Sequence, residues 1–589
     1  MKRSKIFLAI ALVLILVGGI LSNAIDTEFG AVKTQRIYLV DNEAYTVTAN
    51  LFIPKSATAE SPAPAMIICP GGDCPSDIGS PWTTELARRG YVVALIDYTG
   101  CGDTEANPAA QYWTNYGAME MDTVYDYLAA LPFVDEDQIG CGGHSMGSLY
   151  SYRLALKRPV SLVISDVVYW DELPDYNFNF VQISGTHDEG LLMDYKDISE
   201  ICEDPLFLGL FGVDRIEPGK LYGSFADRTA RILYLLNQTH QDDMISGQFI
   251  RTMVGATMDS MNAPNPIPSN NLVYGWKVVA LALAIIGLVM MLFSLADILI
   301  DSSLFSDLKL KTPKTLAGFA PKTKGWWICA AVITLIPLIA FFPGTAAGNK
   351  MASNSLFQLG TTPNGFMVWT LYAAVGLLVF FLVYHFRFGK KLGCNAASYG
   401  FATSDEGGFR FGYIFKSAVL ALILFMSAYY VLLLLFRYAN TDLHIWTNSL
   451  RPLNGTRSQT MPWYTLAMLP YFTLFMLAGN ALQFGDDPEN GKGRGKAVLC
   501  GALVGLVGMI LLYIFYEVTL RTNRPFYTAN FAVFYMDLLS NVLPQFGIAA
   551  ALSIFIRKKT NSYFAGILIG AAMVAFGMVS TNSVAMIIS

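Results

Sequence analysis

The sequence predicts two folds in one chain: an α/β doubly wound sheet, followed by an all-α polytopic transmembrane domain. Charged residues make up 14% of the 589 residues, whereas ordinary soluble domains have about 25%. The shortage is confined to residues 272–589, where long apolar runs alternate with short polar loops. Residues 25–265 carry charge at an ordinary density. We therefore divide the chain into residues 1–24, 25–265 and 272–589.

The first 24 residues combine a basic start, MKRSK, with an apolar run. This pattern is typical of a signal peptide or a signal anchor. Small residues at Ser22 and Ala24 would permit cleavage, so both alternatives stay open, and we favour the uncleaved anchor. In either case the basic flank stays inside, and residues 25–270 are exported.

Eight further apolar runs are long enough to cross about 30 Å of hydrocarbon. Lys and Arg concentrate in the loops that then lie inside, such as 301–324 and 387–412, and are sparser in the loops that lie outside. This bias predicts a multi-pass protein of the cell membrane with an extracytoplasmic domain at 25–265 and the C-terminus outside. It has nine spans, or eight if the first is cleaved. The runs are 274–299, 325–344, 366–386, 413–436, 462–482, 497–517, 530–556 and 562–586.

The net charge and the motifs limit the kinds of partner and cofactor that we expect. The net charge of -5, without a basic stripe, argues against nucleic acid. We find no phosphate loop, dinucleotide glycine motif or metal-ligand spacing, so we expect neither a cofactor nor a metal. The oligomeric state stays open. A disulfide between Cys74 and Cys101 is possible, because both fall in loops at one edge of the predicted sheet in an oxidising setting.

The predicted sheet domain begins with an antiparallel pair, because QRIYLV and YTVTANLFIP alternate apolar and polar residues. Wholly apolar strands follow, and such strands are buried on both faces, as in a parallel sheet. Helical segments separate them, which is the doubly wound pattern. The apolar strands are expected within the stretches 63–77, 84–104, 139–143, 161–170, 177–190 and 230–240.

Ser145 lies between Gly143 and Gly147, after a strand and before a helix-forming run at 148–157. A side chain at either glycine would collide with neighbouring backbone. The sharp turn lifts the serine hydroxyl above the edge of the sheet, where a substrate can reach it. The Gly-x-Ser-x-Gly spacing is weak evidence by itself, but in this strand-turn-helix context it indicates a nucleophile.

A serine hydroxyl needs a base. His240 follows the last strand at the same sheet edge as Ser145, and it is the one histidine of the exported domain placed like a base. We expect His144 to pack away from the site and His187 to be a loop residue. Asp188 follows an earlier strand at that edge and is the candidate to orient His240. The chain order is Ser, Asp, His.

Residues 35–260 resemble α/β hydrolases of the dienelactone-hydrolase or prolyl-oligopeptidase-like type. GYVVALIDYTGCGDT is similar to the Gly-Tyr…Asp-x-x-Gly-x-Gly stretch of that superfamily, and SGTHD to its acid motif. The resemblance implies a serine hydrolase that needs two oxyanion donors. Many relatives have His-Gly where this chain has Pro70-Gly71, and proline has no N–H. We assign the donors to the backbone amides of Met146 and Gly72.

We hypothesise a membrane-anchored, extracytoplasmic serine hydrolase that cleaves an ester, thioester or amide through an acyl-enzyme. Its substrate would be a small molecule or acyl material of lipid or the cell envelope, and it would contact membrane lipid. The alternative is a transporter or sensor whose hydrolase-like domain only binds a ligand. About fifty residues separate Asp188 from His240, and we expect them to form a helical excursion over the site.

The membrane half holds polar residues that need an explanation. Asp537, Asn541 and Gln545 share a helix face at i, i+4, i+8 spacing, close to Pro544, and Glu517 ends the previous run. A carboxylate here is costly unless it is paired or lies in a polar cavity. One interpretation is interhelical hydrogen bonding near the outer interface. The other is a polar site that binds a lipid head group or passes a solute.

Overall fold

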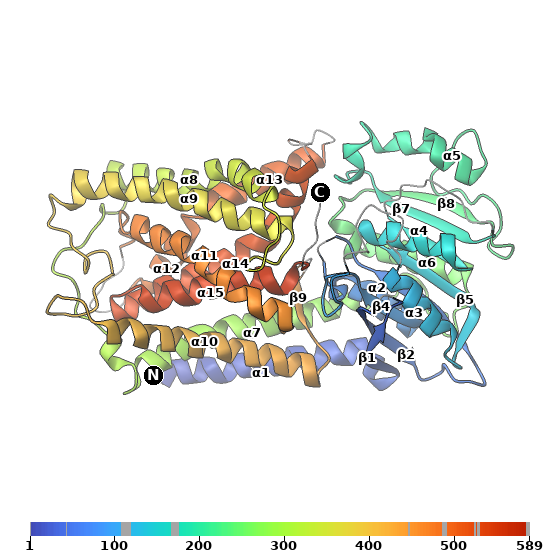
Figure 1. The fold of residues 1–589 in the computed structure, drawn as a ribbon, viewed down its shortest axis with the longest axis horizontal. Helices are drawn as coiled ribbons and strands as arrows, with labels where there is room; N and C mark the ends of the chain where they lie inside the picture. The colour runs from blue at the N-terminus through green and yellow to red at the C-terminus, as the bar shows by residue number, and fades with distance from the viewer. Residues whose placement is uncertain are drawn as a thin grey trace.

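A computed structural model describes residues 2–42, 44–72, 74–107, 119–166, 176–445, 448–485, 492–522, 526 and 530–584. A sheet covered by helices lies at one end of the molecule, and a bundle of long helices lies at the other (Figure 1). We call residues 32–261 the sheet domain. Residues 2–26 and 274–584 form the helical domain.

The sheet has eight strands in the order β1-β2-β4-β3-β5-β6-β7-β8. β2 pairs antiparallel with β1 and β4, and the remaining neighbours are parallel. This arrangement confirms the predicted doubly wound α/β fold. The strands are β1 (Val32–Val40), β2 (Thr46–Pro54), β3 (Ala63–Cys69), β4 (Val92–Asp97), β5 (Val134–Gly143), β6 (Leu162–Ser165), β7 (Asn179–Gly185) and β8 (Arg231–Leu236).

Helices cover both faces of the sheet. α2 (Ser80–Arg88) and α6 (Gly247–Ser260) contribute to the core on one face. The core on the other face includes residues of α3 (Met119–Ala129), α4 (Met146–Lys157) and α5 (Pro205–Phe211). The segment between Asp188 and His240 is partly helical, as expected, with α5 and the short helices Leu191–Met193 and Ile198–Glu203, but its expected place over the site stays a prediction. α5 itself packs into the core of the sheet through Phe207, Leu210 and Phe211.

In the described part of the helical domain, eight helices are long and apolar enough to cross a membrane, and a bent pair makes up to nine. The bent pair corrects one expectation: the apolar run 497–517 is two helices at 55° to one another. Gly501, Gly505 and Gly508 surround the break, and glycine weakens a helix. The helices are α1 (Lys2–Asp26), α7 (Tyr274–Ile300), α8 (Lys324–Asn349), α9 (Thr361–Tyr384), α10 (Phe411–Tyr438), α11 (Gly455–Gly479), α12 (Arg494–Leu503), α13 (Val507–Leu520), α14 (Asn530–Thr560) and α15 (Phe564–Thr581).

α1 and α7 run side by side (Figure 1). Their backbones come close at glycines: a Cβ added at Gly18 would lie 2.5 Å from the carbonyl oxygen of Ala280. At the end next to the sheet domain, Lys277 Nζ lies 2.6 Å from Asp26 Oδ2, and both side chains are buried. Thr84 of α2 also donates to Asp26, at 2.7 Å. The two helices that lead into and out of the sheet domain are therefore joined to each other and to it.

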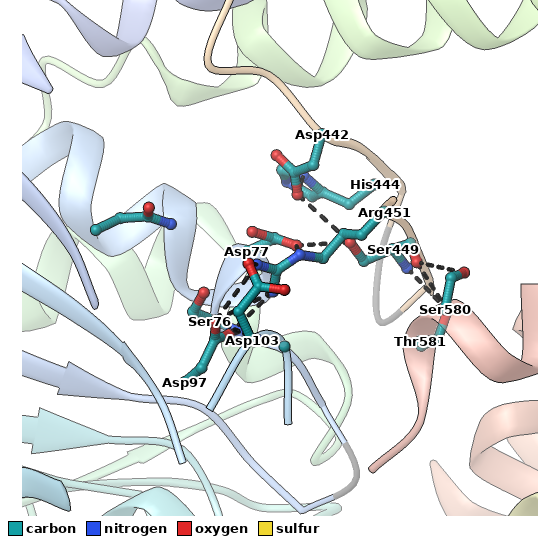
Figure 2. Close-up of polar contacts among 12 residues, drawn as sticks. Ser76, Asp77, Asp97, Asp103, Asp442, His444, Ser449, Arg451, Ser580 and Thr581 are labelled. Atoms are coloured by element: carbon teal, nitrogen blue, oxygen red, sulfur yellow. Dashed lines mark hydrogen bonds and ion pairs between the residues drawn. The ribbon is translucent and has the colours of Figure 1, made fainter. Parts of the chain in front are cut away.

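A polar network joins the domains at the short hairpin of β9 (Leu443–Ile445) and β10 (Asn448–Leu450) (Figure 2). Ser449 Oγ donates to Asp77 at 2.6 Å. The buried Arg451 that follows β10 reaches Asp97, Asp77 and Asp103 of the sheet domain. Although burial would raise the pKa of Asp97, the Arg451 charge holds it well below the usual range. The helical domain thus binds the loops after β3 and β4 through hydrogen bonds and ion pairs.

The possible disulfide between Cys74 and Cys101 does not form, because all eight cysteines are thiols. The two residues belong to different apolar clusters. Cys74 packs with Ile78 and Met244, whereas Cys101 lies in the core on the α3 and α4 face of the sheet.

Candidate active site

Ser145 stands at the strained turn between β5 and α4. Its backbone has φ 53° and ψ -119°, a left-handed region that side chains rarely adopt and that clusters at functional sites. Both neighbouring glycines are required by close backbone. A Cβ at Gly143 would lie 2.3 Å from the Gly147 carbonyl carbon, and one at Gly147 would lie 2.2 Å from the Cys69 oxygen.

Asp188 and His240 follow the adjacent parallel strands β7 and β8, so they meet at the carboxyl edge of the sheet. His240 Nδ1 and Asp188 Oδ2 lie 2.9 Å apart. Burial alone would lower the pKa of His240, but the charge and hydrogen bond of Asp188 outweigh it and hold the pKa well above the usual value. For the completely buried Asp188, the charge of His240 overcomes burial and lowers the pKa.

The sequence neighbour of Ser145 contacts this pair, because the ring of His144 lies 4.4 Å from that of His240. Within the described part of the chain the Ser145 hydroxyl makes no hydrogen bond. Contacts between nucleophile and base often tighten only when substrate binds.

The two amides expected to hold an oxyanion differ in their surroundings. Met146 is the first residue of α4, and the first N–H groups of a helix have no intrahelical partner. Its amide therefore points out of the helix end beside Ser145. Gly72 lies in the turn after β3. A Cβ at the preceding Gly71 would lie 3.5 Å from the Ser145 Cβ, so this turn runs alongside the nucleophile.

His144 does more than pack. Its Nε2 lies 2.9 Å from the carbonyl oxygen of His240. Burial, with the neighbouring His240, lowers the pKa of His144 to about 3, so the ring stays neutral at physiological pH. A neutral ring can donate one hydrogen bond to that carbonyl. His144 therefore fixes the backbone of the candidate base, a role that its place beside Ser145 in the sequence did not reveal.

Two further buried carboxyls, Asp166 and Asp243, were missed. Asp166 follows β6 as Asp188 follows β7, so the strand-end argument applied to Asp188 also applies to it. Its Oδ2 lies 3.7 Å from His240 Nδ1, farther than the 2.9 Å of Asp188. Burial, with the charge of Asp188, raises the pKa of Asp166 to about 7. Asp188 is therefore the better partner for the imidazole.

Among the described residues, His144, Asp166, His240 and Asp243 offer possible metal-ligand atoms that all lie within 4.8 Å of one another. The ring nitrogen of His240 that faces this group is the one that bonds Asp188. A metal ion bound through this nitrogen would displace the Asp188 hydrogen bond. We therefore treat the cluster as the surroundings of His240.

The helical domain reaches the same site. Glu189 Oε2 accepts a hydrogen bond from the backbone N–H of His240 at 3.0 Å. The Glu189 carboxyl also lies close to that of Asp537 of α14, and Asp537 Oδ1 accepts from Tyr516 of α13 at 2.8 Å. Burial, then the charge of Asp537, raises the pKa of Glu189 well above its usual value. In its protonated form Glu189 can donate to Asp537 while accepting from the His240 N–H.

The proximity of Glu189 and Asp537 locates one of the polar residues that the sequence analysis singled out in the helical domain. Asp537 bonds the neighbouring helix, as one interpretation expected, and it also lies at the boundary with the sheet domain, beside the candidate base. Asn541, one turn farther along α14, is buried. Two more contacts join the sheet domain to the helical domain: Arg521 pairs with Asp242 at 2.8 Å, and Leu192 packs against the core of the helical domain.

Residues 80–161, which include α2, β4, β5 and the turn at Ser145, match the model of the Prolyl oligopeptidase family. The sheet domain is an α/β hydrolase. The chain is accordingly a serine hydrolase, with its hydrolase domain joined to helices that are apolar enough to span a membrane.

Solved structures similar to the hydrolase domain include an esterase of Pyrococcus furiosus, with 12% identity over 40% of this chain and 95% of that chain and a TM-score of 0.29. Another is dipeptidyl peptidase 4 of Porphyromonas gingivalis, with 14% identity over 39% of this chain and 36% of that chain and a TM-score of 0.29. A CIB-like hydrolase of Thermoplasma acidophilum has 15% identity over 38% of this chain and 97% of that chain, with a TM-score of 0.27. None of the curated proteins compared with the chain matches it.

Proposed function

We propose that this chain is a membrane-anchored, extracytoplasmic serine hydrolase that uses Ser145, His240 and Asp188 as a triad. The observation that carries the proposal is the 2.9 Å bond between His240 and Asp188 at the sheet edge where the strained Ser145 turn lies. Ser145 Oγ attacks the carbonyl carbon of an ester, thioester or amide while His240 takes its proton. Asp188 holds the imidazole and stabilises its charge.

The amides of Met146 and Gly72 then receive the negative oxygen of the tetrahedral intermediate. His240 returns the proton to the leaving group, and Ser145 retains the acyl group. Water, deprotonated by His240, releases the acid and restores the enzyme. His144 and Glu189 bind the backbone of His240 from two sides and keep the imidazole in position.

The substrate class follows from what borders the site. Leu192 and Glu189, directly after Asp188 in the chain, contact the helical domain. An amphiphilic acyl compound from the bilayer or the cell envelope would meet both domains there, with its carbonyl at Ser145. The close packing of α1 on α7 supports a retained anchor for the amino-terminal segment.

The deciding experiment is covalent labelling of the purified full chain with a fluorophosphonate probe, together with hydrolysis of a soluble p-nitrophenyl ester. Ser145→Ala should abolish labelling and lower kcat by about a millionfold. The matched control is Ser199→Ala, which removes an exposed serine of the same domain and should leave both unchanged. A folded Ser145→Ala protein with wild-type esterase activity would refute the triad and favour the binding-only alternative.

A further inference from the structure

A cavity lies at the end of the helical domain that is remote from the candidate active site. This cavity of about 300 Å³ opens between the last turns of α11 and α14, the start of α12 and the loop that follows α7. Asp537 is near the start of α14, beside the hydrolase domain, whereas the cavity is lined by Ile554 and Arg557 near the end of that helix. The two sites are therefore separated by most of the length of α14.

The lining of this cavity has two kinds of side chain. Five are cationic and none of the described lining residues is acidic. Apolar side chains, among them Phe475, Val504 and Ile554, form the remaining wall. Phe475 also lines a smaller void of about 10 Å³ that lies at the break between α12 and α13. The cations are Lys309, Arg494, Arg557, Lys558 and Lys559.

Two of these cations pair with acidic side chains that lie outside the lining. Lys309 pairs with Asp301, directly after α7, at 2.6 Å, and Lys559 pairs with Asp301 at 3.0 Å and with Asp297 of α7 at 2.5 Å. Arg557 donates to Asn561 at 3.0 Å and lies over the Tyr563 ring. Arg494 has no ion pair among the described residues and is half-buried.

We propose that this cavity binds an anionic membrane lipid, with its phosphate among the cations and the start of an acyl chain against the apolar wall. Basic pockets between membrane helices bind acidic head groups because a partly dehydrated cation gains strongly from an anionic partner. The apolar wall distinguishes a lipid from free phosphate, since phosphate alone gains nothing from contact with Phe475 or Ile554. The site is independent of the chemistry at Ser145.

The test uses the purified full chain in neutral detergent and measures the shift in thermal unfolding midpoint on adding phosphatidylglycerol, phosphatidylcholine or inorganic phosphate. Phosphatidylglycerol alone should stabilise the protein in a saturable way. Arg494→Gln should raise the phosphatidylglycerol concentration for half-maximal shift by about fivefold, and Arg494→Gln with Arg557→Gln should raise it further. Arg494→Gln covers the case in which loss of Arg557 prevents folding.

The matched control is Lys390→Gln with Lys391→Gln, which removes two exposed cations outside the cavity. It should keep the wild-type response. An equal loss in this control would show that the lipid responds only to overall charge, and an equal shift with inorganic phosphate would show a soluble-anion site. Either result, or a wild-type response in both cavity variants, overturns the proposal.

Discussion

Arg451 of the helical domain lies 3.0 Å from Asp97 of the hydrolase domain, and both side chains are almost completely buried. Asp97 ends β4 and also accepts the backbone N–H of Ser76 at 2.8 Å. Arg451 of the helical domain therefore helps to position the loops after β3 and β4, at the edge of the sheet that carries Ser145. Removing one member of a buried pair leaves the other charge without compensation, which costs about 3–5 kcal/mol.

We therefore expect Arg451→Ala to lower the thermal unfolding midpoint of the purified protein and its esterase activity together. Arg437→Ala provides the control, because Arg437 is exposed near the same end of the bundle and surface changes are usually within about 0.5 kcal/mol. If the two variants unfold at the same temperature, Arg451 does not hold the domains together.

The two carboxyls near His240 should differ in effect. Asp188→Asn removes the negative charge and introduces an N–H donor that favours the wrong imidazole tautomer, and in a comparable triad this change lowers kcat by about 10⁴-fold. Asp166→Asn should cost far less, because its oxygen lies 3.7 Å from the same nitrogen. Steady-state kinetics of both variants on one soluble ester would measure the contrast. A larger loss for Asp166→Asn would assign it the triad role.

Glu189 is expected to act in its protonated form. Its pKa is raised in the folded protein, so the folded state keeps a proton that the unfolded chain loses. The stability it contributes is complete below the unfolded pKa and is lost as the pH rises towards the folded pKa. Glutamine mimics the neutral acid, donating to Asp537 and accepting from His240.

Glu189→Gln should therefore match wild type at acidic pH and become relatively more stable as the pH rises, with esterase activity retained. Glu189→Ala breaks both bonds and should lose activity at every pH. Thermal unfolding from pH 5 to pH 9 compares the three proteins. A Gln variant that loses stability in parallel with wild type would mean that Glu189 is ionised in the fold.

Topology can be measured by cysteine labelling in intact cells. Lys311→Cys lies in an exposed loop at the end of the helices remote from the hydrolase domain and should react with an impermeant maleimide only after the membrane is opened. Ser199→Cys, on the hydrolase domain, should react in intact cells. Labelling of position 311 in intact cells would invert the proposed orientation.

The sequence revealed most of what depends on local pattern. The apolar strands and the glycines around Ser145 predicted the sheet and the turn, because strand burial and backbone crowding act over a few residues. The same reasoning at strand ends led to Asp188 and His240. It could equally have led to Asp166, whose place after β6 carries the same signal.

What could not be predicted depends on contacts between distant segments. Nothing in the residues around Asp537 says that it meets Glu189, almost 350 residues earlier in the chain. The Arg451 network likewise needs two domains docked in one orientation. The Cys74 and Cys101 prediction failed for a related reason: a common sheet edge does not bring two side chains into the same cluster.

The paired helices α1 and α7 have a consequence for how a substrate would be chosen. They attach the hydrolase domain at two adjacent points, and Lys277, Asp26 and Thr84 lock that joint. A domain held at two points has little freedom to swing. On the proposed function, Ser145 would therefore keep one height above the lipid surface. The fixed height would make hydrolysis depend on how deeply a substrate lies in the bilayer. The protein would select acyl compounds by how far their scissile carbonyl stands out of the bilayer, and a flexible soluble esterase could not make that selection.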